Sequence, residues 1–194
     1  MSNIFEGLKV IDCGSFIAAP AAATLLADFG ADVIKIEPPG AGDAFRQVPK
    51  LPGMPQSQHP YGWLLDNRNK RGLALDLVKS EGQAALYRLI ADADVFITNY
   101  PLAVRNKLGI DHKRLAALNE RLIYASFTGY GESGAEALPT RAHRSRHHGR
   151  LVATGQRYLV ERHHGAGRVV RRDIYSAAAA REELQCARLL LPLP

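Results

Sequence analysis

The chain of 194 residues has only two cysteines, Cys13 and Cys186. Two thiols so far apart in sequence exclude both a disulfide framework and a CxxC metal site. Its most apolar run, residues 16–27, is also short: these 12 residues cannot span a bilayer, which takes about 20. The residues before that run include acidic side chains and are strand-like, so they do not resemble the basic start of a signal peptide. The sequence therefore predicts a cytoplasmic protein that does not associate with a membrane.

Lysine, asparagine, phenylalanine, tryptophan and methionine are all absent from residues 138–194, which hold eleven arginines and five of the seven histidines. Residues 1–137 carry fourteen basic and fifteen acidic residues, a net charge of −1, so the excess of +7 lies entirely in the tail. Such a composition is typical of a GC-rich gene read out of frame, with a genuine basic tail or a natural extension as alternatives. The sequence predicts a folded part at 1–137 and a poorly ordered basic tail at 138–194, without a packed core over Leu138–Val170.

Short apolar segments alternate with helical patterns through residues 1–137. Alternation of this kind predicts an α/β fold with an open parallel sheet and flanking helices. Residues 38–62, rich in proline and glycine, form a long loop of the kind that is often functional. Ser80 and Asp111 are predicted to cap helices. The expected strands are 8–12, 32–37, 73–77, 94–98 and 122–128, and the expected helices are 21–29, 80–91, 102–108 and one that follows residue 111.

The carboxyl ends of the predicted strands mark where a ligand should bind. In open α/β sheets, ligands bind in the crevice outside those ends. The segments expected there are 14–19, 38–46, 99–101 and 128–134. This pattern indicates the place of a ligand and leaves its chemical class open.

A set of spaced motifs resembles CoA-transferase family III, which includes formyl-CoA transferase, carnitine CoA-transferase and α-methylacyl-CoA racemase. Each motif is weak alone, but together they cover about residues 5–134 in the family's order. The motifs are Gly7-Leu-Lys-Val-Ile-Asp12, Ala18-Ala-Pro20, residues 26–37 with Gly42-Asp43, Asn67-Arg-Asn-Lys-Arg71 with Leu75-Asp76, Ala93-Asp-Val95 with Asn99-Tyr100, Leu108-Gly109, and Leu122-Ile-Tyr-Ala-Ser126 with Gly129-Tyr-Gly131.

The resemblance implies the Rossmann-like, CoA-binding part of an interlocked homodimer that moves CoA between an acyl-CoA and a small carboxylic acid. Family transferases use an aspartate that forms a covalent intermediate, which divides one difficult transfer into two easier steps. That aspartate follows a proline-glycine-aromatic sequence, and no such segment follows Gly131 in this chain. Asp173 lacks the family context, so no catalytic residue is assigned. The chain is expected to be a truncated or frame-shifted member.

The resemblance also implies which residues contact CoA. Phe16, Ile17 and Ala18 match the loop along which the thioester end of CoA passes, and Leu75 matches a residue of the adenine pocket. The cofactor-binding residues predicted in this way are Phe16, Ile17, Ala18, Leu75, Asn99, Tyr100 and Lys107, of which Asn99 and Tyr100 lie beside the cofactor and Lys107 meets a phosphate. Apolar and aromatic walls suit adenine or pantetheine, and a cation suits phosphate.

One position departs from the family pattern. Pro38 stands where formyl-CoA transferase has an arginine after the second strand. One phosphate contact is therefore missing, and Arg46, Arg68 and Arg71 are the residues considered as substitutes for it.

Other functions compete with this interpretation. A racemase-like member, a non-catalytic CoA-binding remnant and an arginine-rich binding protein remain alternatives. The Gly129–Gly134 segment spells GxGxxG but follows the fifth predicted strand, which disfavours a dinucleotide site. The pairs His147-His148 and His163-His164 lack cysteine or carboxylate partners at ligand spacing, so no metal is predicted. Nucleic-acid binding is disfavoured because the tail has only two aromatic residues.

Overall fold

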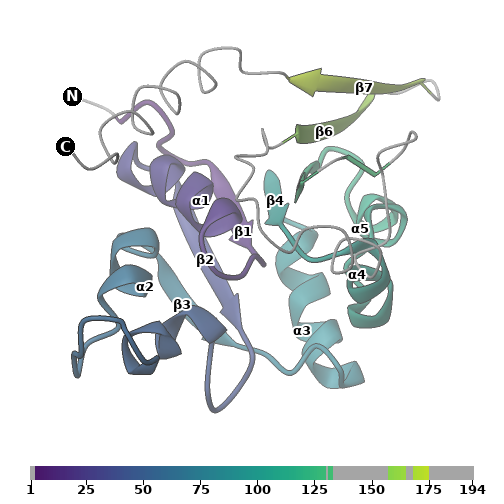
Figure 1. Ribbon diagram of the computed structural model, residues 1–194. Helices are drawn as coiled ribbons and strands as arrows, with labels where there is room; N and C mark the ends of the chain where they lie inside the picture. The colour runs from purple at the N-terminus through teal and green to yellow at the C-terminus, as the bar shows by residue number, and fades with distance from the viewer. Residues whose placement is uncertain (1–2, 130, 133–156, 165–167, 175–194) are drawn as a thin grey trace.

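A computed structural model describes residues 3–129, 131–132, 157–164 and 168–174. Five parallel strands form the centre of the fold, in the order β3-β2-β1-β4-β5 (Figure 1). Their bounds are β1 Lys9–Asp12, β2 Asp32–Glu37, β3 Arg71–Ala74, β4 Val95–Thr98 and β5 Ile123–Thr128. The predicted α/β fold with an open parallel sheet is therefore confirmed.

Helices cover both faces of this sheet. Helix α1 packs on one face, whereas α3, α4 and α5 lie toward the other (Figure 1). The bounds are α1 Ala18–Asp28, α2 Tyr61–Asp66, α3 Ser80–Ile90, α4 Leu102–Leu108 and α5 His112–Leu118, with a 3-10 helix η1 at Ala44–Lys50. Among the described residues, no helix combines the length and the apolar character that a membrane span requires.

Two apolar cores follow from the alternation of side chains along each strand. Val10 packs with Ala19, Ala23 and other residues on the α1 side. Its neighbour Ile11 points to the opposite face, into the larger core that contains Leu86 of α3 and other buried residues. The central strands are thus buried on both sides, which explains their continuous apolar sequences.

The small residues of α1 let this helix lie close to the sheet, directly after the loop that follows β1. A Cβ atom added to Gly14 would lie only 2.5 Å from the Cβ of Ala19. Glycine at position 14 is therefore required by the close approach of α1, which brings the start of the helix to the carboxyl end of β1.

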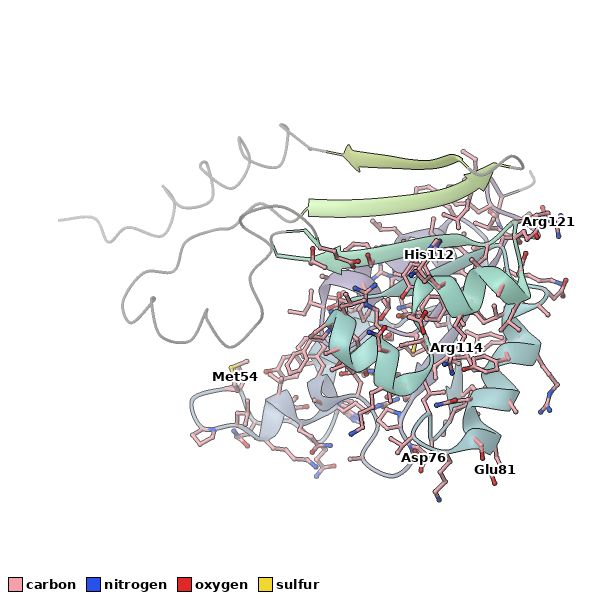
Figure 2. All side chains as sticks on the ribbon, turned by 90° about the vertical axis from the view of Figure 1, so that its right-hand side faces the viewer. Met54, Asp76, Glu81, His112, Arg114 and Arg121 are labelled. Carbon is pink, nitrogen blue, oxygen red and sulfur yellow. The ribbon has the colours of Figure 1, made fainter. Side chains whose placement is uncertain are left out.

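Helix α5 is fixed to the sheet and to α3 by side chains near its start (Figure 2). The His112 ring meets the Tyr124 ring edge-on at 5.4 Å. Arg114 Nη1 donates to the Tyr87 hydroxyl at 3.4 Å. Asp111 caps the helix as predicted, because its carboxylate accepts from the Arg114 amide at 3.1 Å.

Several details differ from the sequence-based expectation. Strand β3 ends at Ala74, opposite the end of β2, whereas the predicted strand continued to Leu77. Ser80 is the first residue of α3 rather than its cap, and its hydroxyl donates to Glu81. The 3-10 helix η1 lies within the segment 38–62 that was predicted to be a loop, and α2 begins at the end of that segment, at Tyr61.

A hairpin continues the sheet beyond β5 (Figure 1). Strand β6, Arg157–His164, runs antiparallel to β5, and β7, Arg168–Ile174, runs antiparallel to β6. The composition of the tail did not indicate these two strands. The other residues of 138–194 lie outside the described residues. The expectation that the tail is poorly ordered, without a packed core over Leu138–Val170, therefore stays a prediction.

Candidate functional site

The candidate site lies at the carboxyl edge of the sheet, between β1 and β4. The strand order changes direction at this point, because β2 and β3 continue to one side of β1 whereas β4 and β5 continue to the other. Such a switch point leaves a crevice between the two loops that follow the central strands. Here those loops are residues 13–17 after β1 and 99–101 after β4.

Asn99 joins these two loops with a two-point hydrogen bond. Its Oδ1 accepts from the Ser15 amide at 2.8 Å, and its Nδ2 donates to the Ser15 carbonyl at 2.7 Å. The side-chain amide thus pairs with the backbone N–H and C=O of one residue, in the way that a neighbouring strand would. Asn99 was predicted to lie beside the cofactor, and in this structure its amide holds the β1 loop.

Asp43 holds the same loop from the other side. Its Oδ1 accepts from the Ser15 hydroxyl at 3.0 Å, from the Phe16 amide at 3.2 Å and from the Phe45 amide at 2.9 Å. Phe16 has a φ of 60°. For a residue other than glycine, this left-handed conformation costs about 1–3 kcal/mol and persists only when its surroundings impose it.

A buried lysine lies directly beneath this loop. Lys35 Nζ donates to the Gly14 carbonyl at 2.6 Å, and it lies 3.6 Å from Asp12 Oδ1 and 3.3 Å from Asp43 Oδ2. The side chains of Lys35, Asp12 and Asp43 are at most 2% exposed. Charges this deeply buried require such pairing.

A second buried lysine completes the charge balance. Lys70 Nζ donates to Asp12 Oδ2 at 2.8 Å and to the carbonyls of Pro20 at 2.7 Å and Asp66 at 2.8 Å. Burial lowers the pKa of Lys70, against the opposing effect of Asp12. The four charged groups Asp12, Asp43, Lys35 and Lys70 therefore form one neutral buried network beneath the β1 loop.

Glu37, at the end of β2, extends this support to η1. It accepts two hydrogen bonds from Arg46, at 2.7 and 2.8 Å, and one from the Asp43 amide at 2.8 Å. The Arg46 guanidinium lies 3.3 Å from the centre of the Trp63 ring, a cation–π contact. Burial opposes ionisation of Glu37, but the hydrogen bonds from Arg46 and Asp43 outweigh it and lower the pKa of its carboxyl group.

We expect the free energy of unfolding to depend less on pH in the acid range after Glu37→Gln. The pKa of Glu37 is lowered by folding, so its contribution is complete above the ordinary value of 4.5 and is lost as the pH falls through the lower folded value. Urea unfolding of both proteins at pH 7, 5, 4 and 3 measures this. The difference in unfolding free energy between the wild type and the variant should shrink below about pH 4.5. A difference that stays constant over this range would contradict the prediction.

A pocket of about 200 Å³ opens beside the two loops. Its lining comes from the start of α1 and from the residues at the ends of β4 and β5, namely Ala18, Asn99, Phe127, Thr128 and Gly129. Phe16 and Ile17, which precede Ala18, are about half exposed, at 48% and 52%. The structure thus brings four of the seven predicted residues, Phe16, Ile17, Ala18 and Asn99, to one place.

The other three predicted residues are not among those that line this pocket. Tyr100 is partly buried against the core, and burial raises the pKa of its hydroxyl to about 12. Leu75 packs against the same core just after β3. Lys107 is exposed on α4. Their contacts with CoA, like those of the first four, remain predictions.

The three arginines considered as phosphate contacts are each engaged with a carboxylate. Arg68 pairs with Asp28, and Arg71 pairs with Asp32 at the start of β2, which is the opposite edge of the sheet. Arg46 lies at the carboxyl edge but pairs with Glu37. Arg46 is therefore the one of the three whose position suits the predicted site.

A further buried cation, which the sequence did not indicate, lies between α4 and β5. The Arg105 guanidinium pairs with Glu132 and lies 3.4 Å from the Tyr124 hydroxyl. Glu132 also accepts from the Ser126 hydroxyl at 2.8 Å. The segment after β5, which follows the pocket residues Thr128 and Gly129, is thereby tied to α4 and to β5.

The part of the chain that the structure describes contains no candidate metal site. No cluster of three or more histidine, cysteine, aspartate or glutamate residues there could hold a metal ion. The two histidine pairs of the tail lie outside the residues whose side chains are described.

Known proteins are similar in sequence to the part of the chain that holds the candidate site. The sequence profile of CoA-transferase family III matches residues 5–145. The chain is 41% identical over 136 residues to cinnamoyl-CoA:phenyllactate CoA-transferase of Clostridium sporogenes, covering 70% of this chain and 33% of that protein. It is 42% identical over 129 residues to the succinyl-CoA–L-malate CoA-transferase beta subunit of Chloroflexus aurantiacus, covering 66% of this chain and 31% of that protein. The chain thus spans about a third of the length of these curated relatives.

Solved structures agree with the sequence comparison. A CAIB/BAIF family protein from Brucella suis superposes with a TM-score of 0.63 at 37% identity, covering 71% of this chain and 36% of that one. An orthorhombic crystal structure of a Mycobacterium tuberculosis protein gives a TM-score of 0.63 at 28% identity, covering 97% of this chain and 51% of that one. The profile match covers more than half of the chain, and the motifs quoted above lie within it. The chain belongs to CoA-transferase family III.

Proposed function

We propose that this chain provides the CoA-binding part of a cytoplasmic enzyme that transfers CoA between an acyl-CoA and a small carboxylic acid, and that the complete enzyme is a homodimer. The observation that carries the proposal is the β1 loop, which Asn99 and Asp43 hold at the switch point of the sheet, beside the pocket. Family membership and the relatives named as CoA-transferases support the reaction class.

The chemistry of the exposed residues suits CoA. Phe16 and Ile17 offer apolar surface at the mouth of the pocket, where the pantetheine arm would lie. Lys107 is an exposed cation on α4, free to reach a phosphate from solvent. Leu75 and Tyr100 offer apolar and aromatic surface for adenine or pantetheine. In this assignment, Asn99 positions the loop and lines the pocket at the same time.

We expect Lys107→Ala to weaken CoA binding by about 1–2 kcal/mol, because a hydrogen bond to a charged group contributes about 1.5–3 kcal/mol and solvent lowers this value for an exposed lysine. Isothermal titration calorimetry with CoA, dephospho-CoA and NAD measures this. Lys113→Ala removes an exposed lysine from the neighbouring helix α5 and serves as the matched control. NAD binding as tight as CoA binding would favour a dinucleotide site instead, and an equal effect of both lysine variants would remove Lys107 from the CoA site.

A non-catalytic CoA-binding role is the second candidate. One observation favours it: among the described residues, those that line the pocket, Ala18, Asn99, Phe127, Thr128 and Gly129, include no carboxylate, histidine, cysteine or lysine. These described side chains supply neither the carboxylate nucleophile that the family's transfer uses nor an acid–base group for racemisation. Both candidates expect CoA binding without transfer by this chain alone. The second candidate also expects no transfer when the remaining part of an intact relative is supplied as a separate chain, whereas transfer in that mixture would support the first.

A further inference from the structure

We propose that Asp43 is a positioning residue for CoA binding: its carboxylate holds Phe16 in the left-handed conformation that presents the β1 loop to CoA. This inference rests on the proposed function, because CoA binding is what the loop geometry would serve. Asp43 is the N-cap residue of η1, lies outside the pocket lining and is itself buried. It therefore acts through the loop rather than by contact with the ligand.

The two oxygens of Asp43 have different tasks. Oδ1 collects three donors, two of them from Ser15 and Phe16, so it fixes the loop at the residue with positive φ. Oδ2 faces Lys35 Nζ at 3.3 Å. Lys35 in turn donates to the Gly14 carbonyl, so the carboxylate and the ammonium hold consecutive residues of one turn.

This arrangement requires a carboxylate and not an amide of the same shape. An asparagine at position 43 would have one oxygen and one NH₂ group. In one orientation, the NH₂ group would face the Lys35 ammonium. In the other, it would face the amides of Phe16 and Phe45. Either orientation places donors against donors, which weakens the hold on Phe16.

The conformation of Phe16 decides where the exposed loop surface points. Phe16 and Ile17 directly precede Ala18, the first residue of α1, which lines the pocket. Without the pull of Asp43, Phe16 would return to the negative φ that residues with side chains prefer. The chain direction at the mouth of the pocket would then change, and the bound conformation would have to be restored when CoA binds.

The test is a double-mutant cycle with CoA affinity, measured by calorimetry, as the readout. We expect Asp43→Asn to weaken CoA binding by about tenfold or more, as the loss of hydrogen bonds to a charged group does. Phe16→Gly also weakens binding, because the ring is lost, but glycine adopts positive φ without a steric cost. In the Phe16→Gly background, Asp43→Asn should therefore weaken binding by no more than about threefold.

Controls separate this role from a loss of folding. Asp111→Ala removes another aspartate that caps a helix, and Asp43→Ala is its counterpart at η1. Only Asp43→Ala should weaken CoA binding. If Asp43 variants do not fold, Ser15→Ala removes one of the three donors to Oδ1 and should weaken CoA binding by a few fold.

The outcomes distinguish the two proposals. A wild-type chain that does not bind CoA contradicts the proposed function, and this inference with it. CoA binding that is unchanged by Asp43→Asn, or weakened equally in both backgrounds, contradicts the positioning role alone. Hydrogen exchange at the Ser15 and Phe16 amides, faster in Asp43→Asn than in Asp111→Ala without any ligand, is the expected structural signature.

Discussion

Replacement of Asp12 by alanine is expected to lower the free energy of unfolding by about 3–5 kcal/mol, the range for removal of one member of a buried ion pair. Asp12 pairs with two ammonium groups, those of Lys35 and Lys70, and all three side chains are at most 1% exposed. The substitution would leave two buried cations against one remaining carboxylate, that of Asp43. Urea unfolding at pH 7, followed by circular dichroism, measures the effect.

Asp32→Ala is the matched control, because Asp32 is also an aspartate at a strand end that pairs with a basic residue. That pair with Arg71 is about half exposed on both sides, so its loss should cost no more than about 1 kcal/mol. Equal costs for Asp12→Ala and Asp32→Ala would show that the buried network contributes no more than a surface pair. A double variant with Lys70→Met should recover part of the loss, because it removes one of the two unpaired cations.

The second large effect is an absence of activity: the purified 194-residue chain should show no CoA transfer between acyl-CoA donors and carboxylate acceptors. No carboxylate lines the pocket in the described residues, and the sequence after Gly131 contains no aspartate in the family context. Without a nucleophile, neither the anhydride nor the thioester intermediate can form. A transferase homologous to the Clostridium sporogenes relative, assayed in parallel, provides the positive control.

Chemical trapping tests this prediction more directly than a measurement of the rate does. The chain is incubated with acyl-CoA, treated with hydroxylamine and digested, and the peptides are mapped by mass spectrometry. No aspartate or glutamate should carry a hydroxamate. A modified Asp173 would overturn the prediction and would assign the nucleophile to the tail.

Much of the central fold could be predicted from sequence, because local patterns and packing agree there. The strand at Asp32–Glu37 and the helix at Leu102–Leu108 were predicted with the bounds that the structure shows. Gly109, with a φ of 69°, ends that helix as expected of glycine. The end of β3 could not be predicted, because it depends on where its partner β2 ends. Helix α2 was missed because its 6 residues make less than two turns, which is too short for an apolar period to show.

The position of the candidate site could be predicted from the sequence. The buried charged residues that support it could not. The strand rule placed residues 14–19 and 99–101 together, and the structure confirms this through Asn99 and Ser15. Lys35 was overlooked, although a lysine between two isoleucines in a buried strand must find a partner. Its partners lie far apart in sequence, so only the fold brings them together. Arg105 was missed for the same reason.

The two edges of the sheet should respond differently to ionic strength. At the amino edge, Lys9 pairs with Asp92 and Arg71 with Asp32, in pairs that are half exposed or more and are therefore screened by added salt. At the carboxyl edge, Lys35 and Lys70 are closed off from water, where dissolved ions cannot reach them. Concentrated salt would thus weaken the ion pairs at the amino edge of the sheet. The carboxyl edge, which carries the pocket, would keep its structure.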